Sequence, residues 1–289
     1  MTLPTFDLQS HSRCSDGVLS PAEVVDRAVA AGVRLLALTD HDTVDGVAEA
    51  REAARAHGIG FSPASEITAV DGPQEDIHVL GYEIDVTHPG LLDSLAEWRS
   101  DRERRIYLMV DRMRDLGWEI DTAAIDERER AGLPIGRPHG ADAVLGHPRN
   151  QDRLTTEGIE GKRELFPAYL VPGAPGFVPR TRPTIEEAVQ IIHAAGGLAV
   201  WAHPYWYAGD PEEALQTLGR YAAAGMDGVE AFYRSHTPEQ TELLCDAAAG
   251  RGMLTTGSPD FHRPEEDVFL GFELYGREPN LGPIGSGSA

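Results

Sequence analysis

Short runs of apolar residues recur along the chain, separated by segments whose apolar residues have helical spacing. Most of these runs span four to six residues and stop at a polar or glycine-containing segment, as buried strands do. We interpret seven runs as strands: residues 5–8, 34–39, 60–65, 77–84, 198–201, 228–232 and 252–256. Because the strands alternate with helical segments, the pattern predicts an α/β fold.

Two helix starts are predicted from capping residues. Ser20 is followed three residues later by Glu23, and Gly32 follows the last apolar residue of the helical pattern. Thr184 and Glu187 have the same spacing ahead of a second helical segment. A Ser or Thr with a Glu three residues later is the signature of a capping box, so helices are expected to begin after Ser20 and Thr184.

The alternation stops between residues 89 and 183. Residues 91–116 have the pattern of a long amphipathic helix, and residues 171–176 are rich in proline and glycine. We therefore predict a (β/α) barrel with an inserted helical cap. The expected parts are the first part of the barrel at 1–88, the cap at 89–183, the second part of the barrel at 184–276 and a disordered tail at 277–289.

Composition narrows the possible partners and compartment. The 289 residues have a formal net charge of −22, which disfavours non-specific binding to duplex nucleic acid or an anionic membrane. No apolar run approaches the ~20 residues of a membrane span. With two cysteines, Cys14 and Cys245, and no basic, apolar leader at its start, the chain is expected to be cytoplasmic. The sequence predicts no oligomeric state.

Histidine and acidic residues stand at or just after the ends of several predicted strands. Strand ends that deliver one or two such residues each can build a metal cluster at the mouth of a barrel. Imidazole and carboxylate ligands without thiolate suit manganese, iron or zinc. The pattern indicates a metal-dependent hydrolase. Residues placed in this way include His11, Asp16, His41, Glu66, His78, His203, Asp260 and His262.

The ordered set of motifs resembles the PHP (polymerase and histidinol phosphatase) family over residues 5–276. The branch that it resembles most contains 3′,5′-nucleoside bisphosphate phosphatases and cyclic phosphodiesterases. Three further segments match that branch: 136–139 (Gly-Arg-Pro-His), 177–180 (Phe-Val-Pro-Arg) and 236–240 (His-Thr-Pro-Glu-Gln). A single short motif would be weak evidence, whereas these segments in the expected order are specific.

The resemblance implies a distorted seven-stranded, TIM-like (β/α)7 barrel that binds two or three divalent metal ions through the eight residues above. It implies an enzyme that hydrolyses a small phosphorylated substrate through attack of a metal-bound hydroxide on phosphorus. The substrate expected first is a nucleoside 3′,5′-bisphosphate or the end of a short oligonucleotide. A cyclic phosphate diester and histidinol phosphate are the alternatives.

Residue 9 departs from the family pattern, because Gln9 stands where the first motif usually has a histidine. Alternate strand positions place Gln9 and His11 on one face, so both are predicted as metal ligands. An amide oxygen is a weaker, neutral donor. Either that metal binds less tightly, or it is absent and two ions suffice. A non-catalytic module that binds metal or nucleotide is the alternative of a different class.

Other polar residues are predicted to act on the substrate. Arg137, His139, Arg180 and His236 are expected to bind phosphate oxygens. His236 or His139 is expected to protonate the leaving group, and Asp260 to take part in catalysis as well as in metal binding. A metal-dependent amidohydrolase with a lysine ligand from a strand is excluded, because the single lysine of the chain, Lys162, lies in the insert.

Overall fold

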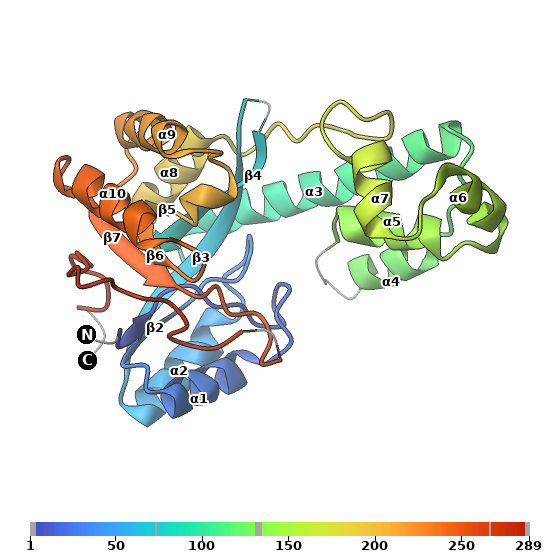
Figure 1. Ribbon diagram of the computed structural model, residues 1–289. Coiled ribbons are helices and arrows are strands. Elements are labelled where there is room, and N and C mark those ends of the chain that lie inside the picture. The colour runs from blue at the N-terminus through green and yellow to red at the C-terminus, as the bar shows by residue number, and fades with distance from the viewer. Residues whose placement is uncertain (1–3, 73, 131–134, 266, 287–289) are drawn as a thin grey trace. The chain divides into compact units, whose positions relative to one another are not determined.

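The computed structural model describes residues 4–72, 74–130, 135–265 and 267–286 (Figure 1). The chain divides into two compact units, each described here by itself. The first, the barrel unit, consists of Met1–Leu95 and Arg182–Ala289, and the second, the insert unit, of Ala96–Thr181.

A seven-stranded sheet forms the barrel unit, with its strands arranged in chain order. After Phe6–Asp7 the chain continues beside the last strand, where Leu8 N donates to Gly257 O at 3.3 Å and His11 N donates to Phe261 O at 2.8 Å. These bonds bring the first and last strands together and confirm the predicted barrel. The strands are β1 (Phe6–Asp7), β2 (Leu35–Leu38), β3 (Gly60–Asp71), β4 (Gln74–Tyr82), β5 (Leu198–Trp201), β6 (Gly228–Tyr233) and β7 (Leu254–Ser258).

Strand β4 departs from the expected strand–helix repeat, because it runs antiparallel to both β3 and β5. The apolar run of β3 continues to Asp71, well beyond residue 65, where we expected it to end. Gly72 follows with a φ of 59°, a left-handed conformation that suits a tight turn. A hairpin therefore replaces one helical connection, and His78 lies within a strand opposite Thr68.

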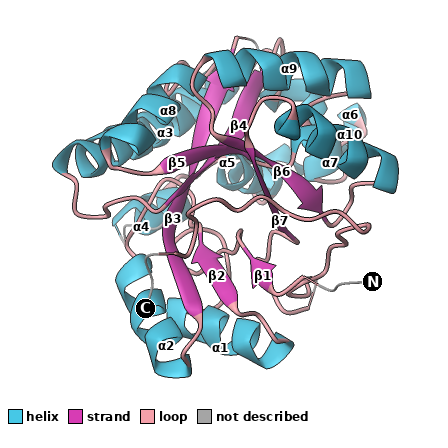
Figure 2. Cartoon of the chain, turned by 90° about the vertical axis from the view of Figure 1, so that its left-hand side faces the viewer, coloured by secondary structure: helices cyan, strands magenta, loops and turns pink. Residues whose placement is uncertain are grey.

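Helices surround the strands of the barrel unit (Figure 2). Both predicted capping boxes are present, at Ser20 with Glu23 and at Thr184 with Glu187. Gly32 has a φ of 97° and ends the first helix, as its position in the sequence predicts. The helices are α1 (Pro21–Ala31), α2 (Val47–His57), α8 (Ile185–Ala194), α9 (Pro211–Ala223) and α10 (Pro238–Ala249).

The insert unit is helical and has an apolar core of its own. The long helix α3 (Pro89–Asp115) contributes Met109 and Met113 to this core, which also contains Trp118 and Leu154. The shorter elements are α4 (Ala123–Arg130), α5 (Arg137–Leu145), η1 (Pro148–Asn150), α6 (Gln151–Glu157), α7 (Lys162–Leu165) and η2 (Phe166–Leu170).

The C-terminal segment differs from the expected disordered tail as far as residue 286. Thr255 N donates to Asn280 O at 2.9 Å, Ile284 is buried, and Gly285 N donates to Glu83 Oε1 at 2.8 Å. These contacts order a segment whose glycine content predicted disorder, because Ile284 and the backbone groups find partners on the barrel. Residues 287–289 of the expected tail lie outside the described residues.

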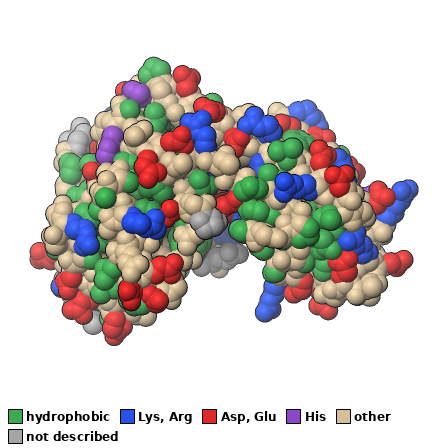
Figure 3. All heavy atoms as spheres, turned by 90° about the horizontal axis from the view of Figure 1, so that it is seen from above, with side chains coloured by type: hydrophobic (Ala, Val, Ile, Leu, Met, Phe, Trp, Pro, Cys, Tyr) green, Lys and Arg blue, Asp and Glu red, His purple; other side chains and the backbone are tan. Residues whose placement is uncertain are grey.

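Acidic and basic side chains are interspersed on the face shown in Figure 3. Among the described helices, none combines the length and the apolar character that crossing a bilayer requires.

Candidate metal centre

Six of the seven strands bring histidine or acidic side chains to one end of the barrel. His11, His41 and His203 follow β1, β2 and β5, Asp260 follows β7, and Glu66 lies within β3. Because β4 is antiparallel, its first half reaches the end at which the parallel strands finish. His78 therefore lies beside the end of β5, where Ala202 N donates to its carbonyl oxygen at 3.1 Å.

Glu66 lies at the centre of this group and is fully buried. Its Oε1 lies 2.7 Å from His78 Nδ1 and 3.4 Å from His203 Nε2. Its Oε2 lies 3.0 Å from His11 Nε2 and 3.7 Å from His41 Nδ1. With different histidines around each oxygen, this carboxylate has the arrangement of a group that can bridge two cations.

Asp16 and Asp260 extend the cluster on two further sides. Asp16 lies 3.4 Å from His262 Nε2 and 3.7 Å from both His41 Nε2 and His11 Nδ1. Asp260 Oδ1 lies 3.1 Å from His11 Nε2 and 3.6 Å from His262 Nδ1. The structure thus brings together all eight histidine and acidic residues at which the sequence pattern predicts ligands.

Three overlapping groups in this cluster have ligand atoms close enough together to hold an ion. The ligand atoms within each group lie within 4.8 Å of one another. The groups are His11, Asp16, His41 and His262; His41, Glu66 and His78; and His11, Glu66 and Asp260.

The nitrogen atoms of the cluster fit metal ligation. Among the described residues, Nδ1 of His11 and Nδ1 of His41 are buried and make no hydrogen bond, and His11 Nε2 lies near Glu66 Oε2 and Asp260 Oδ1 without the geometry of a hydrogen bond. Buried polar atoms without partners are costly unless another group satisfies them, and a divalent cation among imidazoles and carboxylates does so. The donor set therefore fits divalent metal ions.

The charges at the cluster favour cations as well. Burial raises the pKa of Glu66, but His41, His78 and the other nearby histidines outweigh it and hold this pKa well below its usual range. The pKa of Asp16 is also lowered, because His41 and His262 outweigh its burial. Burial lowers the pKa of His41 to about 4 and also lowers the pKa of His203. The same carboxylates raise the pKa values of His11, His78 and His262, so these rings must lose a proton before they can bind a cation.

Two residues at the cluster have left-handed backbone conformations. His203 has a φ of 27° and Asp260 a φ of 60°. A residue other than glycine adopts this conformation at an energetic cost, and such strain is often found at functional sites. In both cases the residue follows a strand end and its side chain lies within the cluster.

Glu230, which was not predicted from the sequence, is a buried carboxyl group that bonds to the backbone of His203 beside the cluster. Glu230 lies fully buried in β6, where Oε2 accepts a hydrogen bond from His203 N at 2.9 Å and Oε1 lies 2.6 Å from Ser258 Oγ. Burial raises the pKa of Glu230 well above its usual value. The signal in the sequence was a single glutamate within the otherwise apolar run of β6.

Gln9 is also buried, and its amide contacts the same network. Its Nε2 donates to Glu66 Oε1 and Oε2 at 3.1 and 3.0 Å, and its Oε1 accepts from Ser258 Oγ at 3.2 Å. A hydroxyl has a single proton, so Ser258 can donate to Gln9 and still bond Glu230 only if Glu230 is protonated. This requirement agrees with the raised pKa of Glu230.

Asp40 holds the loop that contains Asp16. Asp40 accepts hydrogen bonds from Ser12 N and Ser12 Oγ, both at 2.7 Å, and from Ser15 Oγ at 2.8 Å. Gly17 completes this loop, because a Cβ there would lie 2.2 Å from His11 O. The three bonds anchor the loop next to Asp16.

The predicted substrate residues fall in both units. In the barrel unit, His236 is buried beside Tyr205 and Tyr233, with ring centroids 5.2 and 5.4 Å away. Its Nδ1 lies 3.2 Å from Ala231 O, and burial lowers its pKa to about 4. Because a carbonyl only accepts, Nδ1 carries the proton, and Nε2 of the neutral ring is a proton acceptor.

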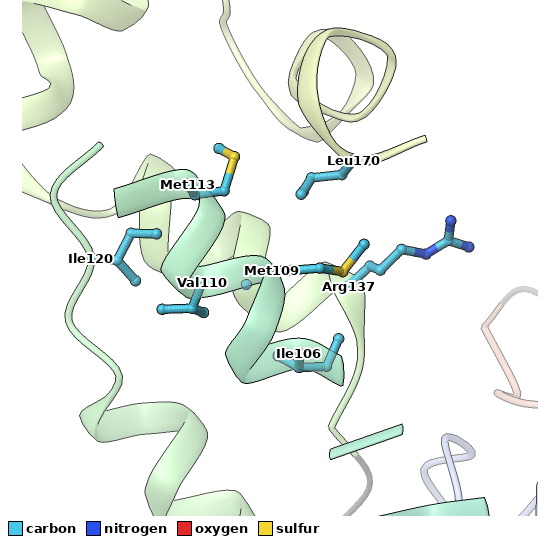
Figure 4. Close-up of a pocket in the computed structure, with 8 residues that line it drawn as sticks. Ile106, Met109, Val110, Met113, Ile120, Arg137 and Leu170 are labelled. Atoms are coloured by element: carbon cyan, nitrogen blue, oxygen red, sulfur yellow. The ribbon is translucent and has the colours of Figure 1, made fainter. Parts of the chain in front are cut away.

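Arg137, His139 and Arg180 belong to the insert unit. Figure 4 shows Arg137 at the edge of an apolar pocket of that unit, next to Met109 and Leu170. His139 Nδ1 accepts from Gly136 N at 3.0 Å, so this residue caps its own helix, and Arg180 is buried.

Comparisons with known proteins agree with this geometry. The family model described as PHP domain matches residues 7–126. A 3′,5′-nucleoside bisphosphate phosphatase of Chromobacterium violaceum is 34% identical over 285 residues, which cover 98% of this chain and 94% of that protein. The 5′-3′ exoribonuclease Rnm of Escherichia coli is 32% identical over 278 residues, which cover 93% and 89%.

A solved structure from Bifidobacterium adolescentis, described as a metal-dependent phosphoesterase, has a TM-score of 0.67 and 28% identity and covers 96% of this chain and all of that one. These relatives match nearly the whole chain, including the parts that carry the clustered residues. The chain belongs to the PHP family and is a metal-dependent hydrolase of phosphoester bonds.

Proposed function

We propose that the protein removes a phosphate from a nucleoside 3′,5′-bisphosphate. The observation that carries the proposal is the convergence of four imidazoles on the two oxygens of the buried Glu66. The similar protein of Chromobacterium violaceum is named for this reaction. A short molecule with several phosphates also suits a protein of net charge −22, because bound cations reverse the sign of the local field.

The proposed metal ligands are the eight clustered residues His11, Asp16, His41, Glu66, His78, His203, Asp260 and His262. Gln9 is proposed as a ninth ligand through its amide oxygen, which accepts from Ser258 here and would have to turn toward the ion. Two or three divalent ions, with manganese, iron or zinc as the candidates, suit this number of imidazoles and carboxylates. When bound, such ions polarise a phosphoryl group and activate water for in-line displacement.

Residues of the barrel unit would prepare the site for this chemistry. Asp40 holds the loop that carries Asp16, and Glu230 holds the backbone of His203. Neutral His236 can accept a hydrogen bond at Nε2, so it would bind a hydroxyl group of the sugar. It would act as an acid only after Nε2 has taken up a proton. The proposed contacts of Arg137, His139 and Arg180 with phosphate oxygens rest on their sequence motifs.

The experiment is release of phosphate from adenosine 3′,5′-bisphosphate with Mn²⁺, compared with an EDTA-treated sample. We expect metal-dependent release in the wild type and a loss of at least about 100-fold in kcat/KM for His41→Ala and Asp260→Ala, because both remove ligand atoms. His57→Ala is the matched control, since His57 is exposed on α2 and pairs with Asp26. Near-normal activity in either ligand variant would contradict the assignment of the site.

A second candidate is stepwise cleavage of short RNA from its 5′ end. The similarity to the exoribonuclease of Escherichia coli favours it. Release of nucleoside 5′-monophosphates from a 5′-phosphorylated trinucleotide distinguishes it from the first reaction, which yields inorganic phosphate. Activity on the trinucleotide but not on the bisphosphate would replace our first proposal.

A further inference from the structure

Trp206 differs from the other tryptophans of the chain in its exposure. All four lie within the described residues; Trp98, Trp118 and Trp201 are 3%, 2% and 1% exposed, whereas Trp206 is 54% exposed. A single exposed apolar side chain is ordinary on a protein surface and needs no functional reason. The position of Trp206 is what points to a role.

The indole of Trp206 contacts two rings that themselves contact the candidate metal centre. Its centroid lies 4.5 Å from that of His203 at an interplanar angle of 38°, and 6.3 Å from that of Tyr233 at 85°. His203 Nε2 lies 3.4 Å from Glu66 Oε1, and Tyr233 OH donates to Asp260 Oδ2 at 3.3 Å. One ring therefore separates the exposed indole from the carboxylates at the centre of the cluster.

The backbone holds Trp206 in this position. It ends the short helix η3 (Pro204–Trp206), and its N–H donates to His203 O at 3.0 Å. On the next residue, Tyr207 OH donates to the carbonyl of Asp76. An aromatic ring that is already in place loses little conformational entropy when a ligand stacks on it.

We propose that Trp206 is the stacking platform for the base of a nucleotide whose phosphate lies at the metal centre; this inference rests on the proposed function. The contacts above place an exposed aromatic ring one residue away from the site of phosphate chemistry, and the sugar of a nucleotide spans that separation. Every base has an apolar face, so stacking adds affinity for nucleotides with little preference among the bases.

Buried polar atoms beside the platform fit the sugar. Among the described residues, Tyr205 OH and His236 Nε2 are buried without a hydrogen-bond partner. Their rings lie 5.2 Å apart, and His236 is 5.4 Å from the Tyr233 ring that Trp206 also contacts. These atoms can bond hydroxyl groups of a ligand that stacks on the indole.

The test compares two ligands that differ only in the base, adenosine 5′-monophosphate and ribose 5-phosphate, on the full chain loaded with Mn²⁺. Acrylamide quenches mainly the exposed Trp206, so we expect the adenosine ligand to protect its fluorescence and ribose 5-phosphate to leave it unprotected. As competitive inhibitors of phosphate release, the two ligands report the same difference through their inhibition constants.

We expect Trp206→Ala to weaken inhibition by the adenosine ligand at least about 10-fold and to leave inhibition by ribose 5-phosphate unchanged. Trp206→Phe should retain binding within about 3-fold, because phenylalanine still stacks. Leu92→Ala is the matched control for truncation of an exposed apolar residue, since Leu92 is 42% exposed on α3. Equal effects of Trp206→Ala on both ligands would overturn the inference.

The fluorescence measurement separates this inference from the proposed function. If no phosphate is released from any substrate but the adenosine ligand still protects Trp206, the proposed function fails and the platform stands. If phosphate is released and the ligand gives no protection, the platform is wrong and the proposed function stands.

Discussion

Asp7 shows how burial inside the barrel changes the protonation of a single carboxyl group. Asp7 in β1 is fully buried; its Oδ2 accepts from Leu270 N at 3.1 Å, and its Oδ1 has no hydrogen-bond partner among the described residues. Burial raises the pKa of Asp7 to about 8. The folded protein therefore keeps this carboxyl group protonated at neutral pH.

Asp7→Asn should flatten the pH dependence of stability. Between about pH 4 and pH 8 the folded state binds a proton at Asp7 that the unfolded state has lost. The free energy of unfolding of the wild type therefore falls as pH rises through this window. We expect the asparagine variant to have a higher Tm than the wild type at pH 8 and a similar Tm at pH 4, measured by calorimetry. A Tm below that of the wild type at both pH values would show that burial of Asp7 is not costly.

Gln9→His should tighten metal binding. Imidazole is a stronger ligand for Mn²⁺ or Zn²⁺ than an amide, and position 9 lies next to both oxygens of Glu66. We expect more metal per protein after dialysis, measured by mass spectrometry of the metal content. Gln9→Leu serves as the comparison that removes both polar atoms. An unchanged metal content in Gln9→His would remove Gln9 from the proposed ligands.

The sequence was informative about residues that interrupt apolar runs at strand ends. His41 and His203 were recognisable because each closely follows a buried strand, three residues after the last residue of β2 and two after that of β5. Glu230 was missed because its role depends on Ser258, which lies 28 residues further along the chain. The glutamate within an apolar run was visible in the sequence, but its partner was not, because a contact between distant residues has no local pattern.

The elements that could be predicted are those with a local signal in the sequence. The helices that begin after Ser20 and Thr184 were predictable because a capping box is local. The direction of β4 was not predictable, because a strand buried on both faces has the same hydrophobic pattern in a parallel and in an antiparallel sheet. The length of the β3–β4 connection was the remaining clue, since a hairpin turn leaves no room for a helix.

Asp40→Asn tests the anchored loop between β1 and α1. The asparagine loses an acceptor for the bonds from Ser12 and Ser15, so the loop that carries Asp16 should loosen. We expect a fall of about 10- to 100-fold in metal affinity, measured by titration with Mn²⁺, with a fold that circular dichroism shows intact. Asp26→Asn, a change of an exposed acidic residue on α1, is the control. Unchanged metal affinity in Asp40→Asn would mean that Asp16 needs no anchor.

For the whole molecule, metal binding and stability of the barrel unit are linked. The clustered residues come from both ends of this unit's sequence, from His11 to His262, so ions that bind them join segments distant in the chain. A ligand that binds only the folded state stabilises it by about 2.7 kcal/mol at 100 times its Kd. Removal of metal should therefore lower the Tm.

Thermal unfolding with excess Mn²⁺ and with EDTA tests this linkage. We expect the wild type to have a higher Tm with Mn²⁺ than with EDTA. In Glu66→Gln, which replaces the central carboxylate with a neutral amide, this difference in Tm should be much smaller. The control variant His57→Ala should keep the full difference. A Tm that does not respond to metal in the wild type would count against a metal centre in this cluster.

The overlap of the three ligand groups also bears on how the ions enter. His11, His41 and Glu66 each belong to two groups, so ions in neighbouring groups share side chains. If two or more groups are occupied, an ion in one would orient residues of the next and place positive charge beside it. Loading would then be coupled, and a titration with metal should depart from the sum of independent hyperbolas. A plot of enzyme activity against metal concentration would then have a steepness that a site for a single ion cannot produce.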